Sequence, residues 1–218
     1  MKKIFIFLLI PFFIMGASFA KEEKSEGCTD VCHMKMCPHK AVELRGDLRK
    51  LWEDHITYIR NYIISALAGL PDVTEVKNRL IKNQESLGEV FKPYYGNEAV
   101  NCITSLLKDH IKITTEVVKA AKERNRIELE KADKKWHKNA DDIASALNGL
   151  NSNWKKQDLK DMLYHHLKFI SGQVTSRVNQ EWKKDIDYYD KGHEHILKFA
   201  DVITKGIVEQ FPKKFESE

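Results

Sequence analysis

The chain contains 218 residues, with 36 lysines and arginines against 32 aspartates and glutamates, and its formal net charge is +4. This near balance gives no electrostatic case for binding nucleic acid or an anionic membrane. The sequence also lacks a Gly-x-Ser-x-Gly elbow and a Gly-rich phosphate loop, so nucleophilic catalysis and nucleotide chemistry have no support.

Residues 1–20 are typical of a cleavable secretory signal peptide. Two lysines precede an apolar run from Ile4 to Met15, and the small residues Ser18 and Ala20 stand just before a charged stretch. The apolar run is shorter than the roughly 20 residues that span a bilayer, and no later segment is apolar enough. We therefore expect a periplasmic or secreted protein that begins near Lys21 and has no membrane span after signal cleavage.

Residues 21–41 form an arm that is rich in sulfur and imidazole groups. The candidate metal ligands of the arm are Cys28, Cys32, His33, Met34, Met36, Cys37 and His39. Soft sulfur ligands combined with imidazole suit copper(I), or zinc if the thioethers take no part. Iron is a weaker expectation, and the Cys-x3-Cys-His spacing is one residue too long for the usual haem attachment.

The same thiols have an alternative use in an exported protein, because oxidising compartments favour disulfides. The chain has four cysteines, three of them in the arm and the fourth at position 102. One disulfide within the arm and one from the arm to Cys102 would use all four. Cys102 stands next to an apolar stripe, and we expect it to be partly buried.

From residue 42 to residue 218, apolar residues recur at helical spacing, and Gly and Pro stand between the periodic segments. No stretch alternates with a period of two. The expected fold class is therefore all-α, an up-and-down bundle of about six helices. The predicted helices are 42–69, 72–92, 97–122, 126–148, 156–180 and 183–211.

An internal repeat organises these helices. The segments LWEDHI at 51–56, LLKDHI at 106–111 and MLYHHL at 162–167 place histidines at 55-residue and 56-residue intervals. The segments 82–85 and 138–141 are also 56 residues apart. The repeat predicts three related helical hairpins, which must pack together because a single hairpin cannot bury its own apolar face.

Polar residues lie inside the apolar stripes of these helices. His55, His110 and His166 stand in the stripes of the odd helices, and Asn83 and Asn139 stand in those of the even helices. In the last helix we place Ile186, Tyr189, His193 and Ile196 on the buried face, with Asp190 one turn before His193. Buried polar groups are costly unless they are hydrogen-bonded, so these side chains need partners.

Three interpretations of the polar residues remain open. A structural layer of His–Asn hydrogen bonds would fix the helix register. A metal site in the bundle would draw on His55, His110, His166, Asp190 and His193, with Glu85 as a further carboxylate. A small-ligand pocket would be lined by the same histidines and by Trp52, Trp136 and Trp182.

The sequence favours an exported helical bundle that binds or handles a metal ion, copper or zinc, at the arm, with a second His/carboxylate site in the bundle. The alternative is a non-catalytic periplasmic or secreted interaction protein with structural disulfides, a structural His/Asn layer and a protein partner in the cell envelope. An enzyme that uses a bundle metal ranks third, so we do not expect catalysis.

Overall fold

The computed structural model describes residues 39–216, so the predicted signal peptide and nearly all of the Cys/His arm lie outside the described residues. Within this range the chain forms six α-helices and no strand, which confirms the all-α class and a helical bundle. The helices are α1 (His39–Ala68), α2 (Val73–Glu89), α3 (Lys92–Lys122), α4 (Arg126–Leu150), α5 (Lys156–Val178) and α6 (Trp182–Gln210), followed by a 3-10 turn, η2 (Pro212–Lys214). None of these helices combines the length and the apolarity that crossing a membrane requires.

The observed helix ends lie within three residues of the predicted ones, except at the start of α3. This helix begins at Lys92 instead of residue 97, because Pro93 fits the first turn of a helix, where its missing N–H is not needed. Gly96 then takes φ 77° and ψ −177° and kinks α3 near its start. The predicted break is therefore a kink inside one helix.

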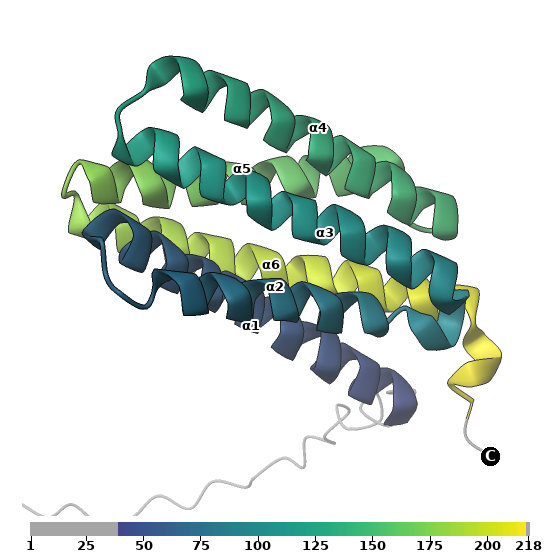
Figure 1. Ribbon diagram of the computed structural model, residues 1–218. Coiled ribbons are helices and arrows are strands. Elements are labelled where there is room, and N and C mark those ends of the chain that lie inside the picture. The colour runs from purple at the N-terminus through teal and green to yellow at the C-terminus, as the bar shows by residue number, and fades with distance from the viewer. Residues whose placement is uncertain (1–38, 217–218) are drawn as a thin grey trace, which may run out of the picture. The chain divides into compact units, whose positions relative to one another are not determined.

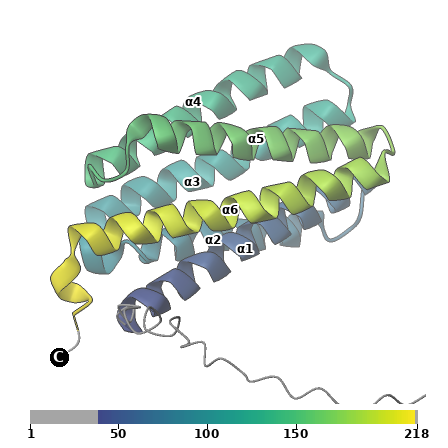
Figure 2. The same cartoon turned by 180° about the vertical axis from the view of Figure 1, so that it is seen from behind.

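The odd and even helices take different places in the bundle (Figures 1 and 2). The helices α1, α3 and α5 contact one another, and each even helix packs against two of them. Helix α2 lies against α1 and α3, α4 lies against α3 and α5, and α6 lies against α5 and α1. Side chains on the shared faces of the odd helices therefore point toward the centre of the bundle.

The three turns from an odd helix to an even helix begin with the same helix-terminating motif. Each contains one residue with positive φ: Gly69 at 68°, Arg124 at 53° and Gln180 at 61°. Each also closes with a hydrogen bond to a carbonyl five residues earlier, from Leu70 N to Ser65 O, Asn125 N to Ala120 O and Glu181 N to Ser176 O. This is the Schellman pattern of helix C-termini, in which glycine is the usual left-handed residue. Only the first turn has glycine there.

The first half of α6 buries a different face from the predicted one, while Ile196 is buried as expected. Ile186 is 50% exposed, whereas Asp185 and Gly192 are buried. Gly192 lies close to α5, because a Cβ atom there would lie 3.3 Å from the Cβ of Phe169. Because α5 approaches so closely, the buried stripe of α6 runs through Asp185 and Gly192. His193 therefore lies at the border between the buried and the exposed face of α6.

Candidate functional site

Three histidines from the three odd helices meet inside the bundle. His55 on α1, His110 on α3 and His166 on α5 are at most 3% exposed. The ring centroid of His166 lies 5.5 Å from that of His55 and 5.9 Å from that of His110. We call these three side chains the histidine cluster. Side chains that the sequence placed in separate stripes thus form one group.

His110 has a hydrogen bond at both ring nitrogens. Its Nδ1–H donates to Asn139 Oδ1 at 2.9 Å, and its Nε2 accepts from Trp136 Nε1–H at 3.3 Å. The amide of Asn139 is itself oriented, because its Nδ2 donates to Leu106 O at 3.0 Å. These contacts fix the tautomer of His110 and leave its ring without a free lone pair for a metal.

His55 has a partner at one nitrogen only. Gln84 Nε2 donates to His55 Nδ1 at 3.1 Å, so the proton of the neutral ring is on Nε2. The nitrogen of this amide also lies 2.9 Å from Leu80 O and 3.0 Å from Asn83 Oδ1, so its two hydrogens are shared among three acceptors. Asn83 in turn donates to Leu51 O at 3.0 Å. The Nε2–H of His55 has no partner within residues 39–216.

His166 is the least satisfied member of the histidine cluster. Neither Nδ1 nor Nε2 has a hydrogen-bond partner in the described part of the chain. The nearest imidazole on α6, that of His195, does not bond His166. Its Nε2 donates to the backbone oxygen of Met162 at 2.7 Å. His166 therefore brings one donor and one acceptor into the core, and neither is bonded to another group of residues 39–216.

The surroundings keep all three imidazoles neutral. Burial, and after it the neighbouring His110, lower the pKa of His55 to about 3. Burial lowers the pKa of His110 to about 4, against the opposing bond to Asn139. For His166, burial and then the charges of His55 and His110 hold the pKa well below its ordinary value.

The remaining predicted ligands do not join the histidine cluster. Asp190 is exposed, and His193 Nε2 lies 3.1 Å from Glu53 Oε1 at the surface. Glu85 accepts from Lys108 at 2.6 Å, also at the surface. His39 is exposed at the start of α1, 3.3 Å from Glu43, and the other arm ligands lie outside the described residues. Between residues 39 and 216 no group of three or more His, Cys, Asp or Glu side chains could hold a metal ion.

The three tryptophans named as pocket residues have separate environments. Trp136 is buried and bonds His110, and Trp52 is buried with its ring edge-on to His55 at 5.2 Å. Trp182 is 54% exposed at the start of α6. Cys102, expected to be partly buried, is instead exposed on α3, because Ile103 faces the core in its place.

The sequence interpretation missed a buried ion cluster between α1, α5 and α6. Asp185 is 1% exposed and accepts from both guanidinium nitrogens of Arg60, at 3.0 and 3.1 Å, and from Arg177 Nη1 at 2.7 Å. A sequence signal existed, because Asp185 is in helical phase with Gly192 and Ile196. The apolar residue next to it, Ile186, obscures this signal in the sequence.

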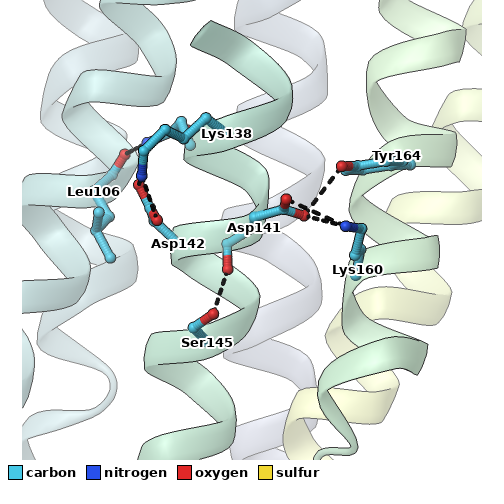
Figure 3. A network of polar contacts seen from close by, with 8 residues as sticks. Leu106, Lys138, Asp141, Asp142, Ser145, Lys160 and Tyr164 are labelled. Atoms are coloured by element: carbon cyan, nitrogen blue, oxygen red, sulfur yellow. Dashed lines mark hydrogen bonds and ion pairs between the residues drawn. The ribbon is translucent and has the colours of Figure 1, made fainter. Parts of the chain in front are cut away.

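A second polar network joins α4 to α5 at the surface (Figure 3). Asp141 accepts from Tyr164 Oη at 3.1 Å and lies 2.9 Å from Lys160 Nζ. Next to it, Lys138 donates to both carboxylate oxygens of Asp142, at 2.9 and 2.8 Å. These groups are part-buried or exposed ion pairs, and we assign them to helix packing.

Comparison with protein-family models, with curated proteins and with solved structures finds no match to this chain.

Proposed function

We propose that this protein is an exported, non-catalytic helical bundle that binds copper or zinc through its Cys/His/Met arm. The observation that carries the proposal is the separation of ligand types along the chain. Seven soft or imidazole ligands lie between positions 28 and 39. In the bundle, His110 uses both ring nitrogens in hydrogen bonds and His55 uses its Nδ1. The arm is therefore the better candidate for metal binding.

We further propose that the bundle arose from three copies of one hairpin and that its polar layer fixes their register. One hydrogen bond recurs in each hairpin, to the carbonyl four residues before the clustered histidine. The donors are Asn83 to Leu51 O, Asn139 to Leu106 O and His195 to Met162 O. The three donors are spaced by 56 residues, as the sequence repeat would require. The equivalent turns with positive φ support the same view.

The test is metal analysis of the full chain, exported and purified without a chelating step, together with a count of free thiols. We expect copper or zinc at a fixed ratio to protein. The ratio should fall to background when Cys28, Cys32 and Cys37 are all changed to Ser. The matched control His166→Gln, inside the bundle, should keep the metal. Loss of metal from the control, with retention by the triple Ser variant, would place the ion in the bundle and contradict the proposal.

A second candidate is an interaction protein whose cysteines form disulfides. Cys102 is exposed on α3, so its thiol is accessible to another cysteine. Mass spectrometry of the non-reduced protein, digested with trypsin, would detect a peptide linked through Cys102. A protein without free thiols and without metal would favour this candidate over metal binding.

A further inference from the structure

A pocket of about 340 Å³ lies where α1, α3 and α5 end and α6 begins. Half of its lining is apolar or aromatic, and the rest contains three cationic side chains and no acidic one. The lining residues are Leu67, Ala68, Lys122, Arg124, Arg177, Val178, Gln180 and Trp182. We call this the turn pocket. Its size is at the lower end of the range for small-molecule sites.

Backbone strain is concentrated at the turn pocket. Arg124 and Gln180 are the two residues other than glycine with positive φ in the described part of the chain, and both line it. The equivalent residue of the first turn is Gly69, which adopts this conformation without strain. Residues held in such sparsely populated backbone conformations cluster at functional sites. The backbone conformations of these two turns therefore make Arg124 and Gln180 candidate functional residues.

The cations of the turn pocket are only partly neutralised. Arg177 shares the carboxylate of Asp185 with Arg60, so two guanidinium groups face one negative charge. Lys122 Nζ donates to Ala66 O at 2.6 Å, which satisfies a proton but leaves the charge. Arg124 makes no ion pair or side-chain hydrogen bond within residues 39–216. The turn pocket therefore has a surplus of positive charge.

An aromatic wall stands beside these cations. Trp182 is 54% exposed, and the Arg177 guanidinium lies 5.4 Å from the centroid of its ring. Leu67 and Val178 continue the apolar surface. A ligand that matches this lining has an anionic head for Arg124 and Lys122 and an apolar or aromatic body for Trp182.

We propose that the turn pocket binds a small organic carboxylate with an apolar body. The carboxylate accepts hydrogen bonds from Arg124 and Lys122, and the body packs on Trp182. The planar guanidinium of Arg124 suits a carboxylate, with which it can form two parallel bonds. This site is independent of the metal proposed for the arm, because it uses only residues between positions 67 and 182.

The probe is octanoate, with octanol as its uncharged counterpart, added to the full chain below the micellar range. Trp52, Trp136 and Trp154 are at most 7% exposed, so a change in tryptophan emission on binding should come from Trp182. We expect a saturable blue shift with octanoate, weaker binding of octanol by about tenfold, and no response in Trp182→Phe. Equal binding of octanol, or a response that does not saturate, would overturn the proposal.

The key variant is Arg124→Gln, which we expect to weaken octanoate binding about tenfold or more. Arg126→Gln is the matched control, since Arg126 lies in the same turn, is exposed and pairs with Glu130 at 2.9 Å. Arg124→Gly removes the same charge while suiting the left-handed backbone, so it should fold and still lose binding. Unchanged affinity in both Arg124 variants, or an equal loss in Arg126→Gln, would refute the assignment.

Discussion

The α3–α4 and α5–α6 hairpins hold their buried polar groups in different ways. In α3–α4, His110 bonds both Asn139 and Trp136 in the core. In α5–α6, His166 is left without a partner among the described residues, while Asp185 bonds two arginines nearer the turn. Similar sequence segments thus support one hairpin through a central hydrogen-bond network and the other through a peripheral ion cluster.

Acid should remove more stability than any single substitution proposed below, because all three clustered histidines are neutral when folded. Their folded pKa values lie below the unfolded value of about 6.5. The unfolded chain therefore binds protons first as the pH falls. The stability is fully present above about pH 6.5 and is lost as the pH falls toward 4 and 3, by about 2 kcal/mol at pH 5 for each of His55 and His110.

Urea denaturation at pH 7, 6 and 5 would measure this loss. His166→Leu should make the free energy of unfolding depend less steeply on pH, because it removes one of the three titrating histidines. Neither ring nitrogen of His166 has a hydrogen-bond partner among the described residues. A free energy of unfolding that stays constant between pH 7 and 5 would show that the rings are not held neutral.

The ion cluster of α5–α6 should give the largest effect of a single substitution. Asp185→Asn leaves Arg60 and Arg177 without their carboxylate, and we expect a loss of about 3 kcal/mol in the free energy of unfolding. This is the lower end for buried pairs, because both arginine side chains are about a fifth exposed. Asp187→Asn breaks only an exposed pair with Lys183 and should cost less than about 1 kcal/mol. Equal losses of unfolding free energy in the two variants, measured by urea denaturation, would show that the buried cluster stabilises the protein no more than the exposed pair.

Replacing the central histidines tests the comparison directly. His110→Leu leaves Asn139 Oδ1 and Trp136 Nε1–H unpaired in the core, at a cost of about 2 kcal/mol. His166→Leu removes two ring nitrogens that bond nothing in residues 39–216 and should stabilise the protein by about 1 kcal/mol. Thermal unfolding of the two variants should shift in opposite directions. A shift of the same sign and size would mean that His166 is as well bonded as His110.

Local patterns in the sequence were enough to predict the helices, their turns and the odd-helix histidines. Apolar spacing and Gly or Pro breaks act over a few residues, so they can be found without knowing the partners of a helix. Gln84 and Asp185 were missed because their roles depend on other helices, through His55 and through Arg60. The buried face predicted for the first half of α6 was wrong for the same reason, since the packing of Gly192 against Phe169 cannot be inferred from α6 alone.

The smallest expected effect concerns the turns, where the hairpins agree in backbone and differ in sequence. Arg124→Gly replaces a residue at φ 53° with one that adopts this conformation freely, and it should stabilise the protein by about 0.5–1 kcal/mol. Arg126→Gly, within the first turn of α4, should instead destabilise it by up to about 1 kcal/mol, because glycine loses more entropy in a helix. Urea denaturation of both variants decides the sign. If Arg124→Gly destabilised the protein, the arginine side chain would stabilise the folded state by more than the backbone strain costs. Stability alone would then explain the arginine at this position, and the proposed role in ligand binding would not be needed.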